Sequence, residues 1–132
     1  MHKILIVEDD ESTRKDIHEL FSNAGFEVVG AIDGMDGLTK AHENTDIDVV
    51  LTDYQMPNKD GLSMCLDMRK LPHLQDTPIF ILSSHVDQKL SGLGHNAKIM
   101  AWITKPYIPD SLVKGIVQVL NARQLSYKGG RK

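Results

Sequence analysis

The sequence predicts an α/β fold in which a parallel β-sheet carries helices on both faces. Two observations lead to this prediction. Short, continuously apolar segments recur five times along the 132 residues, and each is followed by a segment with apolar residues at helical spacing. Strands that are apolar on both sides must be covered on both faces. Right-handed crossovers then make a doubly wound, five-stranded sheet the economical topology.

Five segments have the composition of buried strands. Each is four or five residues long, rich in β-branched and other apolar residues, and bounded by charged residues, Gly or Pro. The predicted strands are residues 3–7, 27–31, 48–52, 79–82 and 100–104.

The first predicted helix follows residues 3–7. Ser12 and Thr13 are candidate N-caps, and Thr13 with Asp16 resembles a capping box. Gly25 is expected to end the helix, because glycine commonly ends helices. The predicted inward face consists of Ile17, Leu20, Phe21 and Ala24.

The second and third predicted helices begin at aspartates. Asp33 can cap a short helix that extends through Ala41. Asp60 opens the third helix, and Pro72 bars its continuation. The residues of the third helix that we expect to face inward are Leu62, Cys65 and Leu66.

The sequence predicts the last of the five helices more clearly than the one before it. Ser84 and Asp87 could form a capping box for a helix whose apolar residues are Val86, Leu90 and Leu93. Gly92 and Gly94 predict that this helix is short or mobile. The final helix begins at Pro109, which suits the first helical position. Its apolar stripe is Leu112, Ile116, Val119 and Leu120.

Composition narrows the class of protein. The net charge of −3 favours neither a nucleic acid nor a membrane surface as partner. The single Cys65 excludes an internal disulfide and fits a reducing compartment. No apolar run is long enough to cross a membrane, so we expect a cytoplasmic protein. We also expect a monomer, with one domain at 1–125 and a polar, basic tail at 126–132.

Polar residues follow four of the five predicted strands. Because parallel strands end at one edge of the sheet, these residues should meet there. Clustered carboxylates repel one another, and a bound cation offsets their negative charge. Mg²⁺ is the usual cation where the donors are oxygens. A metal, a lone Asp, a hydroxyl and a Lys together suit phosphoryl transfer to a carboxylate. The residues are Glu8, Asp9 and Asp10, then Asp53, then Ser83 and Ser84, then Thr104, Lys105 and Pro106.

Four segments carry a resemblance to a known family. They are ILIVEDD, VLTDYQMPNKDG, FILSS and WITKPY, and they occur in this order at the predicted strand ends. The sequence resembles the receiver domains of two-component response regulators, especially the single-domain chemotaxis type, over about residues 3–123. The resemblance implies a flavodoxin-like receiver fold with strand order 2-1-3-4-5.

The resemblance also implies how the acidic residues act. Asp53 matches the phospho-acceptor. Glu8 and Asp9 match the acidic pair that holds Mg²⁺, Asp9 directly and Glu8 through water. Together with Asp53, the backbone carbonyl of Gln55 completes the protein's share of the coordination.

The remaining implied roles belong to residues that contact the phosphoryl group or change conformation in response to it. Ser83 matches the residue whose hydroxyl meets the phosphoryl group, and Lys105 matches the family's lysine. The bond from Lys105 to Pro106 resembles the family's cis peptide. Trp102 stands where the family places a switching aromatic, so Ser83 and Trp102 form the implied switch.

The implied function is that of a phospho-acceptor that is at most a slow catalyst of its own phosphorylation and dephosphorylation. A histidine kinase, phosphotransfer protein or small phosphodonor would supply the phosphoryl group. Only seven residues follow residue 125, so we expect output by docking to a protein partner through the helix after Ser84, the strand at 100–104 and the start of the last helix.

Three alternatives stay open. The chain could be a phosphorelay intermediate or a receiver excised from a larger regulator. A Mg²⁺-dependent phosphatase resembling the haloacid dehalogenase class would need a second Asp where Gln55 stands. A flavin- or nucleotide-binding module of the same fold would need a Gly-rich or Ser/Thr-rich loop after the first strand, where acids stand instead.

Overall fold

The computed structural model forms one five-stranded parallel sheet, and it describes residues 2–85, 92 and 94–130, with side chains as far as residue 123 of the last helix. The strands lie in the order β2-β1-β3-β4-β5, which confirms the predicted topology. Their bounds are β1 (Lys3–Val7), β2 (Glu27–Ala31), β3 (Val49–Asp53), β4 (Ile79–Ser83) and β5 (Ala101–Thr104).

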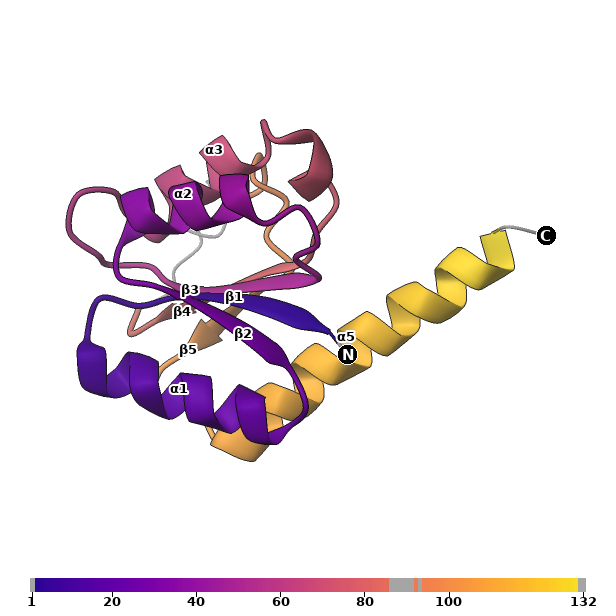
Figure 1. The fold of residues 1–132 in the computed structure, drawn as a ribbon, viewed down its shortest axis with the longest axis horizontal. Coiled ribbons are helices and arrows are strands. Elements are labelled where there is room, and N and C mark those ends of the chain that lie inside the picture. The colour runs from indigo at the N-terminus through magenta and orange to yellow at the C-terminus, as the bar shows by residue number, and fades with distance from the viewer. Residues whose placement is uncertain (1, 86–91, 93, 131–132) are drawn as a thin grey trace.

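Helices cover both faces of the sheet. Figure 1 shows α2 and α3 on one face and α1 and α5 on the other. The predicted helix with Val86, Leu90 and Leu93 falls largely outside the described residues. The bounds are α1 (Glu11–Asn23), α2 (Gly34–Glu43), α3 (Gly61–Met68), the 3₁₀ turn η1 (Pro72–Leu74) and α5 (Pro109–Gly130).

Two apolar cores lie on opposite faces of the sheet. Successive residues of a strand point to opposite faces. Leu5 of β1 therefore packs in the core beneath α2 and α3, whereas its neighbour Ile6 packs in the core beneath α1 and α5. The apolar stripe predicted for the last helix is confirmed, since Leu112, Ile116 and Leu120 are all buried in the second core.

Four boundaries, on three strands, differ from prediction by one residue. β3 extends through Asp53, which is paired with Leu82 of β4. Asp48 lies outside the strand, and its carboxylate instead accepts a hydrogen bond of 2.8 Å from the backbone N–H of Lys3. β4 ends at Ser83 rather than residue 82, and β5 begins at residue 101 rather than 100. The acidic tip of the third strand is thus part of the sheet.

The N-cap of α1 is Asp10, so the prediction of Ser12 or Thr13 was wrong. The backbone N–H and the hydroxyl of Thr13 both donate to Asp10 Oδ2, at 2.8 and 2.6 Å. Asp10 is the N-cap because its side chain accepts a hydrogen bond from the N–H three residues ahead, which is the usual N-cap bond. The caps predicted at Asp33 and Asp60 are confirmed by the same kind of bond.

Two residues predicted to face inward do not. Leu66 of α3 is exposed, and Met64 and Met68 are buried in its place, because the helix turns those two residues toward the sheet. Ala24, at the end of α1, is also exposed, whereas Ile17 and Phe21 are buried as predicted.

Helix α5 continues past the position where we expected the domain to end. It runs to Gly130, and Figure 1 shows its C-terminal part extending away from the sheet. The division at residue 125 therefore does not coincide with a break in secondary structure. Over the residues that the structure describes, no helix is both long and apolar enough to span a bilayer.

Arg69, the C-cap of α3, joins the end of this helix to the segments before β4 and before β5. Its guanidinium donates to the carbonyls of Leu74 at 2.6 Å and Thr77 at 2.7 Å, before β4. It also donates to the carbonyls of Ala97 at 2.8 Å and Lys98 at 3.1 Å, before β5. Both connections are thereby fixed to α3.

We predict that Arg69→Met destabilises the fold. Hydrogen bonds to a charged donor contribute about 1.5–3 kcal/mol each, and their loss leaves partly buried carbonyls without a partner, so the free energy of unfolding should fall by at least about 2 kcal/mol. Urea denaturation followed by circular dichroism measures this. The neighbouring Lys70→Ala is the control, because Lys70 is exposed and its ion pair with Asp67 is a surface contact. Equal stability of both variants would contradict the assignment.

Candidate functional site

The residues that follow the strands are held by the sheet's own hydrogen bonds. The ladder continues one residue beyond three of the strands, so these residues have the rigidity of the sheet although they lie at its edge. The bonds are Glu8 N–H to Ala31 O at 3.1 Å, Tyr54 N–H to Leu82 O at 2.9 Å, and Lys105 N–H to Ser83 O at 2.9 Å.

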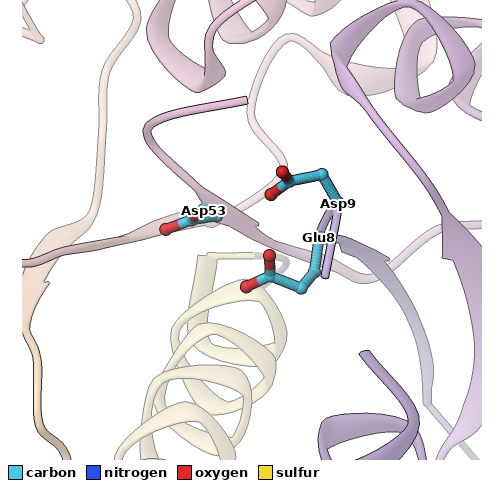
Figure 2. A group of neighbouring side chains, drawn as sticks. All are labelled: Glu8, Asp9 and Asp53. Atoms are coloured by element: carbon cyan, nitrogen blue, oxygen red, sulfur yellow. The ribbon is translucent and has the colours of Figure 1, made fainter. Parts of the chain in front are cut away.

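Three carboxylates gather at this edge. One oxygen each of Glu8, Asp9 and Asp53 lies within 4.8 Å of the others. Figure 2 shows Glu8 and Asp9, which are successive in the chain, both directed to the side on which Asp53 lies. Glu8 and Asp53 are buried, with 3% and 8% of their surface exposed, whereas Asp9 is open to solvent. The structure thus brings together all three acids predicted to hold a metal.

Glu8 is the most perturbed acid of the cluster. Burial of its carboxyl is the main cause that raises the pKa from 4.5 to about 7. The N–H of Asp10, which donates to Glu8 Oε2 at 3.1 Å, lowers the pKa in part, while the negative charge of Asp53 raises it further. Below about pH 7 Glu8 therefore tends to keep its proton, which a bound cation would displace.

Lys105 supplies the opposing charge. Its Nζ donates to Asp53 Oδ1 at 2.7 Å, across the sheet from the end of β5 to the end of β3. Burial lowers the pKa of Lys105, but the hydrogen bond and the charge of Asp53 outweigh it, so that the net pKa is raised. Lys105 is thus fully protonated and tied to the carboxylate that we expect to react.

The acid cluster fits a hard divalent cation by its chemistry. Its donors are all carboxylate oxygens, the type that Mg²⁺ prefers. Burial first, and then the negative charge of Asp53, raise the pKa of Glu8, and a cation would offset the second of these effects. Asp9 keeps one side of the cluster open to water. Gln55 lies exposed two residues after Asp53. Its carbonyl as a fourth donor remains a prediction.

Ser83 is buried at the same edge, but its hydroxyl is engaged with its own chain. Ser83 Oγ donates to the carbonyl of His85 at 2.7 Å and accepts from the N–H of His85 at 3.3 Å. A contact between this hydroxyl and a phosphoryl group would require the bond to the carbonyl to break. The peptide bond from Lys105 to Pro106 is cis, as the resemblance implied.

Trp102 lies on β5, one strand away from Ser83. Its indole is partly buried against the core beneath α2 and α3. The ring centroid lies 6.1 Å from that of Tyr54, with the two ring planes at 58°. Trp102 therefore contacts the residue that directly follows Asp53.

Sequence reasoning overlooked three residues around the acids. Arg14 of α1 donates to the backbone carbonyl of Glu8 at 2.9 Å, and Tyr54 contacts Trp102. A Cβ on Gly61 would collide with the backbone carbonyl oxygen of Asp53, so only glycine fits there. The spacing of Arg14 from Glu8 carries no recognisable signal, whereas a glycine directly after the capping Asp60 is a visible one.

Comparisons with known proteins point to one family. The family described as response regulator receiver domain matches residues 4–117. The response regulator ArlR of Staphylococcus saprophyticus is 35% identical over 122 residues, which are 91% of this chain and 53% of that protein. The transcriptional regulatory protein PrrA of Mycobacterium tuberculosis is 32% identical over 123 residues, 92% and 51% of the respective chains. The chain thus spans about half the length of these curated relatives.

Solved structures agree with this result. The chemotaxis protein CheY4 of Vibrio cholerae superimposes with a TM-score of 0.85 at 30% identity, covering 90% of this chain and 98% of that one. The receiver domain of the Francisella response regulator 1452 superimposes with a TM-score of 0.81 at 29% identity, covering 94% and 99%. Both are similar to this chain over nearly its whole length.

We predict that Mg²⁺ binds the acid cluster and raises the melting temperature. A ligand that binds only the folded state stabilises it in proportion to the logarithm of its concentration over Kd. Asp9→Asn should weaken this effect, because it removes a charged oxygen donor. Asp46→Asn is a matched control, since Asp46 is exposed and pairs with Lys3 rather than with the cluster. An equal Mg²⁺ response in both variants would place the metal elsewhere.

We predict a pH dependence of stability in the absence of Mg²⁺. Between pH 4.5 and about 7 the folded state binds a proton on Glu8 that the unfolded state has lost. The free energy of unfolding should therefore fall as pH rises through this window. The total fall is about 1.4 kcal/mol for each unit by which folding raises the pKa of Glu8. Urea denaturation in EDTA at several pH values measures this for wild type and Glu8→Gln. The fall attributable to Glu8 should be absent in Glu8→Gln, and parallel curves would refute it.

Proposed function

The chain belongs to the response regulator receiver domain family of two-component signalling, and from this premise we propose that it accepts a phosphoryl group on Asp53. The observation that carries the proposal is the 2.7 Å bond between Lys105 and Asp53, inside a cluster of three carboxylates at the end of the central strand. Asp53 is the acid of this cluster that is in contact with a cation.

The proposed step is a phosphoryl transfer to a carboxylate. An oxygen of Asp53 forms a bond to phosphorus, and the bond from phosphorus to the donor's nitrogen or oxygen breaks, with its electron pair leaving on the donor. The product is an acyl phosphate on Asp53. Lys105 offsets the negative charge of the transferring oxygens. Mg²⁺, held by Glu8, Asp9, Asp53 and the carbonyl of Gln55, would supply further positive charge when bound.

A histidine kinase or a phosphotransfer protein is the proposed donor, as is usual for the family. No side chain is placed two residues after Asp53 to act as acid or base, since Gln55 has no titratable group. Turnover should therefore be slow. The chain then acts as a phospho-acceptor in signalling rather than as a phosphatase.

The proposed output runs through Ser83, Trp102 and the edge of the sheet. A phosphoryl group adds negative charge and acceptor oxygens beside Lys105, and the hydroxyl of Ser83 could turn from His85 to meet them. Trp102 on β5 would respond to that movement. The proposed docking face for a downstream protein comprises the segment after Ser84, β5 and the start of α5.

A second role is favoured by the lengths of the relatives. The proteins that match are about twice as long as this chain, and one of them is named as a transcriptional regulatory protein. The chain could accordingly be the receiver part of such a regulator, or an intermediate that passes the phosphoryl group on. The single-domain proposal includes three further expectations. The chain is divided into a receiver at 1–125 and a tail at 126–132, it is monomeric, and it makes no direct contact with nucleic acid.

We predict one Mg²⁺-dependent phosphoryl adduct after incubation with acetyl phosphate. Intact-mass spectrometry should show it in wild type and in the control Asp60→Asn, which alters a helix cap instead of the cluster. Asp53→Asn should show none, because its neutral amide replaces the carboxylate nucleophile. Lys105→Met should form the adduct more slowly. An undiminished adduct in Asp53→Asn would overturn the assignment.

We predict that the effect of the phosphoryl group extends along β5. Beryllofluoride with Mg²⁺ mimics an acyl phosphate, and amide chemical shifts in wild type should change from residue 84 to 108 as well as around Asp53. The same addition to Asp53→Asn should leave the spectrum unchanged. Shift changes confined to the loops next to Asp53 would exclude the proposed docking face as the output.

A further inference from the structure

The indole of Trp102 rests on a backbone that has no side chain. A Cβ built on Gly94 would lie 2.8 Å from Cζ2 and 3.0 Å from Nε1 of Trp102. Carbon atoms in van der Waals contact stay about 3.5–4.0 Å apart. A methyl group on residue 94 and the indole in its present place therefore exclude each other.

The turn that carries Gly94 is fixed to the rest of the protein. The N–H groups of Ala97 and Ile99 both donate to the carbonyl of Gly94, at 3.2 and 3.3 Å. Arg69 holds the same turn from outside through the carbonyls of Ala97 and Lys98. Since this turn is anchored to α3, a clash between a larger residue 94 and the indole would be relieved by movement of the indole.

The indole also contacts the residue that directly follows Asp53. Tyr54, the ring neighbour of Trp102, directly follows Asp53, and its N–H is bonded to Leu82 of β4. The carbonyl of Tyr54 accepts from the N–H of Gly61 at 2.8 Å. Trp102 thus contacts two fixed segments, one of which bears Asp53.

We propose that Gly94 is a positioning residue that allows Trp102 to lie inward against Tyr54, and that a side chain at residue 94 would move the indole outward. A hollow of about 610 Å³ lies beside the indole. The position of the indole follows from these contacts alone, while its consequence for signalling rests on the proposed function. The hollow is lined by Gly92, Gly94, His95, Lys98, Ile99 and Trp102.

Gly94→Ala with Gly92→Ala as control tests the proposal. Both glycines lie in the same segment, but a Cβ on Gly92 would meet no atom within 4 Å. Trp102 is the only tryptophan, so intrinsic fluorescence reports on its surroundings. Without Mg²⁺ or phosphodonor, Gly94→Ala should shift the emission to longer wavelength and increase quenching by acrylamide. Gly92→Ala should match wild type. Unchanged emission and quenching in Gly94→Ala would overturn the proposal.

A second comparison covers the case in which Gly94→Ala folds poorly. The substitution should lower the urea midpoint when residue 102 is Trp and should lower it much less in the Trp102→Leu background, where the clashing atoms are missing. This difference is the coupling between the two residues. An equal loss in both backgrounds, or failure to fold in both, would show that Gly94 does not act through Trp102.

A third measurement separates this inference from the proposed function. Beryllofluoride with Mg²⁺ should change the fluorescence of wild type and of Gly92→Ala, and should change that of Gly94→Ala far less, because its indole has already moved. If the indole is displaced in Gly94→Ala while wild type does not respond to beryllofluoride, the positioning role stands and the proposed switch fails. If wild type responds to beryllofluoride and Gly94→Ala responds to the same extent, the positioning role fails.

Discussion

The ion pair between Lys105 and Asp53 is the interaction on which the site depends. It joins the ends of two strands that lie on either side of β4, and it places a fixed positive charge against three carboxylates. Without Lys105, two buried acids and a third beside them would repel one another, and no other cation among the described residues forms an ion pair with them. The raised pKa of Glu8 shows that one lysine does not offset all of this charge, because burial and the charge of Asp53 still favour the protonated acid. A divalent cation is the natural complement of such a cluster.

Rigidity at the edge of the sheet is what makes this arrangement possible. The backbone ladder continues past β1, β3 and β5, so that Glu8, Tyr54 and Lys105 start from fixed positions. Gly61 brings the start of α3 close to the carbonyl of Asp53, and Arg14 holds the carbonyl of Glu8. A carboxylate that is held in this way would lose little freedom in the proposed reaction.

The proposed output requires movement, rather than rigidity, between Asp53 and the edge strand β5. Output needs an element with two arrangements whose balance the phosphoryl group can change. Ser83 and Trp102 have that potential, since the hydroxyl of Ser83 is bonded to the backbone of His85 and the indole of Trp102 lies against Gly94 and Tyr54. Arg69 fixes the turn before β5, so movement in this region falls on side chains rather than on the turn.

The sequence by itself determined the fold class, the strand order through the family resemblance, and the set of residues at the strand ends. These follow from the apolar strand pattern and from the rule that parallel strands end at one edge. Only the tertiary structure decided what those residues contact. Asp10 rather than Thr13 caps α1, because a cap depends on the backbone angles at one residue. The burial of Glu8 depends on the packing of the whole sheet edge. The contacts of Trp102 with Tyr54 and with Gly94 join segments that are distant or separate in the chain. No local pattern encodes such contacts, because they arise only when separate strands and turns pack together.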